Sequence, residues 1–165
     1  MWNCENRGGL KGIVILPECM VEEIAIEDEN KWQYKIVTKE KCSPLVLPEY
    51  EGKDYSYEES EQITEQGEMY NVSIQGFVPS QYVKRQDMER MKHTGVIVLT
   101  MDNLGECRVF GSKEVPLTFS ASETVPSNLT AAKGHTFLIE GIQPECSRFI
   151  SHATFNIFAD SVFFL

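Results

Sequence analysis

The histidines and cysteines of this chain are the residues that could bind a metal or carry out nucleophilic catalysis. His93, His135 and His152 lie in three different predicted elements, and none has a second metal-binding residue at a usual spacing. Cys146 and His152 are the nearest thiol and imidazole, but their six-residue separation matches neither a zinc finger nor a zincin. No sequence signature of a cysteine nucleophile surrounds any cysteine. We therefore expect no metal, no cofactor and no catalytic group, and a protein that is not an enzyme.

Oxygen-rich segments offer two further chemistries, and both have simpler explanations. The segment Asp102–Glu106 could suggest calcium, but it lacks the alternating carboxylates and the distal glutamate of a calcium loop. Its residues are those that a tight hairpin turn requires. Glu58 and Glu59 could form the carboxylate pair of a glycosidase, which only their separation in space would decide. A hydrolase built on such acids stays a third hypothesis, because no nucleophile, base and orienting group can be named.

Acidic residues are concentrated in one stretch of the chain. The segment from Glu49 to Glu68 contains eight acids against Lys53 alone, a net charge of −7 out of −10 for the whole chain. Binding to duplex DNA or to an anionic membrane needs clustered lysine and arginine, so neither is an expected partner. The acidic stretch is interpreted as a solvated loop that aids solubility, or as a surface that repels phosphate.

The length and composition are those of one ordinary globular domain covering residues 1–165, with 42% hydrophobic and 24% charged residues. The longest apolar runs are far shorter than the roughly 20 residues of a membrane helix. The amino terminus has no secretory signal pattern, and the five scattered cysteines include no CxxC pair. These features favour reduced thiols and a cytoplasmic protein.

Short runs with period-two alternation or β-branched residues dominate the chain and predict strands. The predicted strands are Ile13–Leu16, Val21–Ile26, Trp32–Val37, Leu45–Leu47, Met69–Phe77, Val96–Met101, Cys107–Phe110, a strand ending at Phe119, Thr136–Ile142, Arg148–Ser151, Thr154–Phe158 and Val162–Leu165. Between Lys39 and Gly67 the pattern weakens, which predicts a long excursion from the core, and Ser120–Lys133 is predicted to be a loop.

One helix is predicted from about Ser80 to Lys92, with Ser80 as its amino-terminal cap. Val83, Met88 and Met91 are its expected core residues, with Tyr82 beside them. Many short strands around one helix predict a mainly β fold, an antiparallel β-sandwich or barrel with one packed α-helix.

The order of elements from Tyr55 to Phe119 resembles that of phage and prophage tail-type structural proteins. The resemblance rests on Tyr57-Glu58 in a polar excursion, a strand that opens with Gly67-Glu68-Met69-Tyr70, a helix, and then VIVLTMDNLGECRVFG and VPLTF. It implies a non-enzymatic structural protein that self-associates through its sheets into rings or tubes. Its partners would be further copies or other virion-type proteins, and it would be cytoplasmic before assembly and in a virion or phage-like particle afterwards.

A different hypothesis is a monomeric β-sandwich module that binds carbohydrate or protein through exposed aromatic side chains. The rings and acids considered as interaction residues under these hypotheses are Trp32, Asp54, Tyr55, Tyr57, Glu58, Glu59 and Glu61. Exposed rings that form a platform or cleft would favour the binding module, whereas rings in the core would not.

Overall fold

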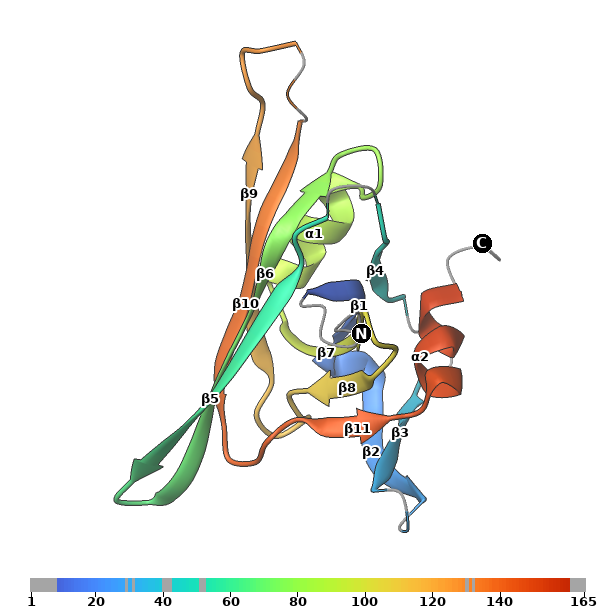
Figure 1. Cartoon of the computed structure of the whole chain (residues 1–165), viewed down its shortest axis with the longest axis vertical. Coiled ribbons are helices and arrows are strands. Elements are labelled where there is room, and N and C mark those ends of the chain that lie inside the picture. Colours follow the sequence, from blue (N-terminus) through green and yellow to red (C-terminus); the bar gives the residue numbers. More distant parts are fainter. Residues whose placement is uncertain are drawn as a thin grey trace, which may run out of the picture.

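The computed structural model describes residues 9–28, 30, 32–39, 43–50, 53–129, 131 and 133–160. Within them the fold is mainly β, with eleven strands and two α-helices (Figure 1). The strands are β1 (Leu10–Pro17), β2 (Val21–Asp28), β3 (Gln33–Thr38), β4 (Leu45–Leu47), β5 (Ser56–Thr64), β6 (Gly67–Pro79), β7 (Gly95–Asp102), β8 (Cys107–Phe110), β9 (Leu117–Thr124), β10 (Gly134–Gln143) and β11 (Arg148–Ile150). The helices are α1 (Arg85–Lys92) and α2 (His152–Ala159), and a 3₁₀ turn η2 covers Glu18–Met20.

The strands form a sheet that divides into two layers at β7. Its order is β2-β3-β11-β8-β7-β9-β10-β6-β5, with β1 paired to β4 and β7. One edge of β7 pairs with β1, while the other pairs with β9 at Gly95 and Val96 and with β8 from Val98 onward. We call the four antiparallel strands β9-β10-β6-β5 the outer sheet, and it stands as a tall layer beside the rest (Figure 1). The predicted mainly β fold, a β-sandwich or barrel with a packed helix, is confirmed, although β11 pairs with β3 in parallel and a second helix, α2, is present.

Two of the central strands are buried on both faces. Ile13 and Ile15 of β1 pack into the core between the layers, whereas Val14 and Leu16 pack into a second core under α2. A strand that is covered on both sides reads as a continuous apolar run, because neither face has to be polar. This explains the run Ile13–Leu16, and the same division holds in β7.

Helix α1 is shorter than its predicted range of Ser80–Lys92. The Ser80 amide donates to the Lys133 carbonyl oxygen at 3.0 Å, and the Tyr82 amide donates to the Pro79 carbonyl oxygen at 3.0 Å. Ser80 therefore extends the pairing of β6 with β10 and is followed by a turn, so it does not cap the helix. The predicted core residues Val83, Met88 and Met91 are buried.

The prediction of a strand at Thr154–Phe158 is wrong, because these residues lie within helix α2. The Ser151 hydroxyl accepts a hydrogen bond from the Thr154 amide at 3.1 Å and caps the helix. Phe155 and Phe158 pack into the second core at helical spacing. The apolar residues of the segment TFNIF fit the period of a strand as well as that of a helix. Only the capping serine, Ser151, indicated the helix. The strand predicted at Val162–Leu165 lies outside the described residues.

The acidic segment is another difference from the prediction. The stretch between Lys39 and Gly67 contains β4, as predicted, but Ser56–Thr64 is the regular strand β5 and not part of a loop. β5 pairs with β6 over its whole length, from Ser56 opposite Gln75 to Thr64 opposite Gly67. Similarly, the loop predicted from Ser120 begins only after Thr124, because β9 continues to that residue.

Candidate functional site

The oxygen-rich segment Asp102–Glu106 is the hairpin turn between β7 and β8 that its residue types predict. Asp102 Oδ1 accepts hydrogen bonds from the Leu104 and Glu106 amides at 2.9 and 2.8 Å. Gly105 has a φ of +88°, which glycine adopts without strain. The His152 ring contacts the Gly105 carbonyl oxygen. In the described part of the chain, no group of three or more histidine, cysteine or acidic side chains is placed to hold a metal.

The three predicted interaction rings do not form a platform. Tyr55 is 1% exposed, and its hydroxyl donates to the Pro48 carbonyl oxygen at 3.0 Å. Burial raises the pKa of the Tyr55 phenol well above its ordinary value. Tyr57 packs against the Phe110 ring with centroids 4.9 Å apart. Trp32 is 73% exposed, at the turn into β3. The assignment of Tyr55 as an interaction residue is therefore wrong, because its ring belongs to the core.

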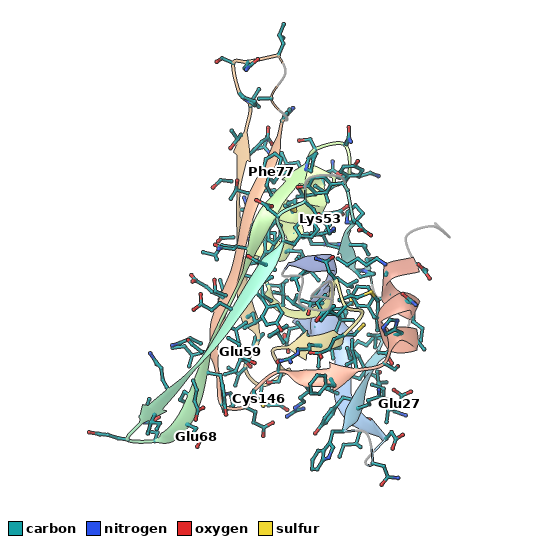
Figure 2. All side chains as sticks on the ribbon, in the orientation of Figure 1. Glu27, Lys53, Glu59, Glu68, Phe77 and Cys146 are labelled. Atoms are coloured by element: carbon teal, nitrogen blue, oxygen red, sulfur yellow. The ribbon has the colours of Figure 1, made fainter. Side chains whose placement is uncertain are left out.

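The predicted interaction acids lie on or beside β5, but they have different surroundings. Glu58 and Glu61 are exposed, and Asp54 accepts a hydrogen bond from the Phe77 amide at 2.9 Å. Glu59 accepts hydrogen bonds from the Ser147 amide at 2.7 Å and the Ser147 hydroxyl at 3.0 Å. Glu59 therefore connects β5 to the turn before β11, and Cys146 lies close to it in Figure 2.

The two end strands of the outer sheet are open to further pairing. Among the described residues, β5 pairs only with β6. Beyond Thr118, β9 pairs only with β10. The β5–β6 hairpin extends away from the body toward Glu68, and the β9–β10 hairpin extends from the opposite end (Figures 1 and 2). An open strand edge presents unpaired amides and carbonyls, and it is a site where another chain can add.

The outer sheet also has an unusual charge distribution. Its four strands contain no lysine or arginine. They contain six acids, which are Glu58, Glu59, Glu61, Glu68, Glu123 and Glu140. Of these acids, Glu58 and Glu140 lie on the face turned away from the core, which is otherwise mostly serine, threonine, asparagine and glutamine. Such a surface repels phosphate and offers no cation to bind it.

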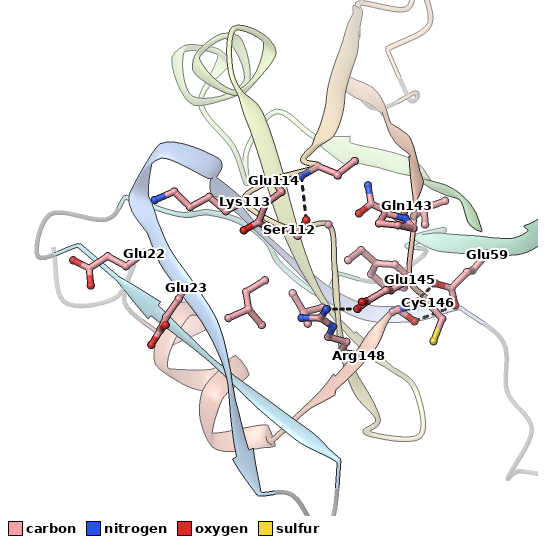
Figure 3. A pocket seen from close by; sticks show the side chains of 18 residues that line it. Glu22, Glu23, Glu59, Ser112, Lys113, Glu114, Gln143, Glu145, Cys146 and Arg148 are labelled. Atoms are coloured by element: carbon pink, nitrogen blue, oxygen red, sulfur yellow. Dashed lines mark hydrogen bonds and ion pairs between the residues drawn. The ribbon is translucent and has the colours of Figure 1, made fainter. Parts of the chain in front are cut away.

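A cleft of about 460 Å³ lies beside the lower end of the outer sheet. It is bounded by β2, by the segment 111–115 and by the turn 143–148 (Figure 3). Its lining includes apolar side chains of Val72, Val109, Phe110 and Val115. Figure 3 shows Glu22 and Glu23 on the β2 side, with Glu145 and Cys146 on the other.

Charges and one unpaired donor define the chemistry of this cleft. The acids in its lining are Glu22, Glu23, Glu59, Glu114 and Glu145, and the bases are Lys113 and Arg148, a net charge of −3. Arg148 is ion-paired with Glu145. Gln143 is 5% exposed, and its Nε2 has no hydrogen-bond partner. A buried amide donor without a partner costs free energy, so this position favours a ligand that supplies an acceptor.

Sequence reasoning missed the cleft, although one signal pointed to Gln143. Positions 137, 139, 141 and 143 of β10 share the face that is turned toward the core. A glutamine at the end of this otherwise apolar or small series is a polar group at an inward position. The turn 143–148 and strand β2 are far apart in the chain, so their proximity depended on tertiary structure.

The remaining thiols provide a testable property of the fold. Cys107 is 2% exposed, and burial raises the pKa of its thiol to about 11, with Asp102 and Glu106 adding to the effect. Cys19 and Cys146 are exposed. We expect iodoacetamide at pH 8 to alkylate Cys107 at least about tenfold more slowly than Cys146, because the thiolate is the reactive form. Mass spectrometry of time points would measure this, and equal rates would contradict the buried placement.

The raised pKa of the Cys107 thiol also predicts that the protein becomes less stable in alkaline solution. The unfolded thiol has an ordinary pKa of about 8.5, below that of the folded thiol, so the unfolded chain releases its proton first. Stability is therefore complete below about pH 8.5 and falls as pH rises toward about 11. Urea unfolding between pH 8 and 11 would measure this decline, and Cys107→Ala should reduce its slope.

Comparison with known proteins identifies no relative. No family model matches the chain, and no curated protein or solved structure is similar to it. None of the described helices is both long and apolar enough to cross a membrane.

Proposed function

We propose that this protein is a non-enzymatic structural subunit of a phage-like, tail-type assembly, and that its copies associate side by side through the outer sheet. The observation that carries the proposal is that β5 is paired on one side only, and that β9 is paired on one side only beyond Thr118. Assembly with further copies or other virion-type proteins would cover these edges. The protein would then be cytoplasmic before assembly and part of a virion or phage-like particle afterwards.

Strand direction supports a repeating lateral contact. The outer sheet contains an even number of strands, and each runs antiparallel to its neighbour. When a second copy is placed beside the first by rotation about an axis along the strands, its β9 runs antiparallel to the first copy's β5. The same contact can then repeat around a ring, because each copy presents both edges.

The charges on the two edges favour the pairing of β5 with β9 over the pairing of two β5 edges. β5 carries Glu58, Glu59 and Glu61 and no base, so two β5 edges would repel each other. β9 carries only Glu123, and its exposed face is hydroxyl-rich. In a ring of such contacts one face of every outer sheet would line a common channel. That lining would carry acids but no lysine or arginine, which suits the passage of a polyanion without binding to it.

The test places charges on β9 and measures association. Ser120→Glu with Ser122→Glu puts two negative charges opposite the acidic β5 edge, and we expect association to weaken about tenfold or more. The matched variant, Ser120→Lys with Ser122→Lys, adds similar bulk with opposite charge and should retain association. Both serines are exposed, so neither variant disturbs the core.

Native mass spectrometry across concentrations and negative-stain electron microscopy would measure association. We expect rings or tubes from the original protein and from the lysine variant, and monomers from the glutamate variant. A strictly monomeric original protein would refute the proposal, as would equal assembly of the two variants.

A further inference from the structure

Strand β2 stands at the opposite end of the strand order from β5, and its outer edge is open. Among the described residues, β2 pairs only with β3. The cleft lies beside the first half of β2, because its lining contains Glu22, Glu23 and Ile24 but no residue of β3 (Figure 3). An end strand presents unpaired amides and carbonyls, and open space beside it allows another segment to add. The edge of β2 is separate from those of β5 and β9.

The side chains of β2 alternate between an apolar face and an acidic one. Pairing with β3 is regular from Glu23 to Ile26, so successive residues of this stretch point to opposite faces. Ile24 is half-buried on one face, and Ile26 is 53% exposed on the same face. Glu23 and Ala25 lie on the other face. A segment added here would therefore meet apolar side chains at every second position.

The charge of β2 favours a basic partner. The strand contains four acids and no base, and these acids are Glu22, Glu23, Glu27 and Asp28. The three glutamates are exposed, and none of them makes an ion pair within the described chain. β3 adds one base, Lys35, so the two strands together carry a net charge of −3. Basic side chains on an added segment would offset this charge.

The open edges of further copies do not match β2. β5 is acidic, and β9 carries one acid and no base. Two β2 edges would place their glutamates against each other, which is unfavourable. The occupant that fits β2 is therefore a segment of a different protein.

The cleft wall opposite β2 contains a polar group that also indicates a bound segment. Gln143 lies on this wall in Figure 3, and its Nε2 is a buried donor without a partner. A segment that pairs with β2 along one edge turns its other edge, with free carbonyl acceptors, toward this wall. A buried donor is normally satisfied by such an acceptor.

We propose that the open edge of β2 receives an extended segment of a different protein in which basic and apolar residues alternate. The backbone of the segment would pair with Glu23–Ile26. Its apolar side chains would lie beside Ile24 and Ile26, and its basic side chains would lie beside the glutamates. The contact goes beyond the proposed association of β5 with β9 and does not depend on it, because it uses the other end of the sheet.

A short synthetic peptide tests this contact. The probe is fluorescein-labelled Lys-Val-Lys-Val-Lys-Val-Lys, and fluorescence anisotropy measures its binding to the full chain. One control peptide has the same residues in blocks, Lys-Lys-Lys-Lys-Val-Val-Val. The other is the alternating peptide with N-methylated amides, which cannot donate to a strand edge. We expect both controls to bind at least about fivefold more weakly, because the first loses the alternation and the second loses the backbone pairing.

Charge reversal locates the edge that binds. Glu23→Lys with Glu27→Lys should weaken binding of the alternating peptide about tenfold or more, because attraction at the edge becomes repulsion. The matched variant, Glu58→Lys with Glu61→Lys, makes the same change of charge on β5 and should alter binding less than about twofold. All four glutamates are exposed, so neither variant disturbs the core. Amide hydrogen exchange at Glu23–Ile26, but not in β5, should slow when the peptide binds.

The outcomes separate strand addition from general attraction between opposite charges. Slower exchange at Glu23–Ile26, together with the loss of binding on charge reversal in β2, would support the inference. Equal binding of the three peptides would overturn it, as would no binding of the alternating peptide. A larger loss of binding in the β5 variant than in the β2 variant would also overturn it. None of these results bears on the proposed function, because rings or tubes are measured without the peptide.

Discussion

Replacing Phe137 by alanine is expected to lower the free energy of unfolding by about 3–5 kcal/mol, because a large side chain is removed from a closed site. Phe137 is 0% exposed and lies at the centre of the core between the two layers. Its ring packs against that of Tyr55, with centroids 5.7 Å apart. Across the pair of strands it faces Gly76, which leaves room for the two rings. Alanine would leave a cavity that these neighbours cannot fill without moving the strands.

Urea unfolding followed by circular dichroism would measure the loss. Phe149→Ala is the matched control, because Phe149 is 40% exposed and its main described contact is the Arg108 guanidinium, 4.8 Å from the ring centroid. Loss of this contact should cost about 1 kcal/mol or less. If the two variants lost the same stability, the assignment of Phe137 to the core would be wrong.

Gly134→Ala is expected to cost about 1–3 kcal/mol, through a clash and not through a cavity. A Cβ at this position would lie 2.4 Å from the Val78 carbonyl oxygen and 2.9 Å from the Pro79 Cα. Both are backbone atoms of β6, so the strands themselves would have to separate. Gly134 also pairs with Thr124, at the ends of β9 and β10. The variant should therefore loosen the pairing of these two strands as well as destabilise the fold.

Gly12→Ala is the control for this variant. A Cβ on Gly12 would be 3.6 Å from the Phe155 ring, which is ordinary contact. Its expected effect lies between no change and a gain of up to about 1 kcal/mol, because alanine has less conformational entropy to lose on folding. Thermal unfolding and amide hydrogen exchange in β9 and β10 would compare the two. Unchanged exchange near Thr124 and Gly134 in the Gly134→Ala variant would show that the strands accommodate the methyl group.

The parts of the fold that the sequence predicted correctly are those with a local cause. The turn at Asp102–Gly105 follows from the side-chain oxygen of Asp102 and from a glycine at positive φ. Strands β1 and β7 follow from β-branched runs, and the inward face of α1 from Met88 and Met91 at helical spacing. The error at Thr154–Phe158 occurred because two local patterns fitted equally well. The segment containing Phe155 and Phe158 was read with period two, and the helical period applied because it packs both rings under β1 and β7.

The acidic segment was misread for a different reason. Glu58, Glu59 and Glu61 are unfavourable in an isolated strand, and their density suggested a solvated loop. In the fold they occupy an end strand, where pairing with β6 fixes the backbone. Solvent reaches Glu58 and Glu61, and Glu59 is hydrogen-bonded to Ser147. Only the partner strand could reveal this, because strand propensity depends on neighbours more than on the residue itself.

The sequence alone therefore determined the class of fold, the position of most strands, the inward face of the first helix and the lack of a recognisable catalytic motif. Only the tertiary structure decided which strands end the sheet, that Tyr55 is core, and that an acidic cleft lies at the Gln143 end of β10. The first group follows from interactions between residues a few positions apart. The second depends on pairing between distant segments, such as Glu59 with Ser147, whose register no local pattern specifies.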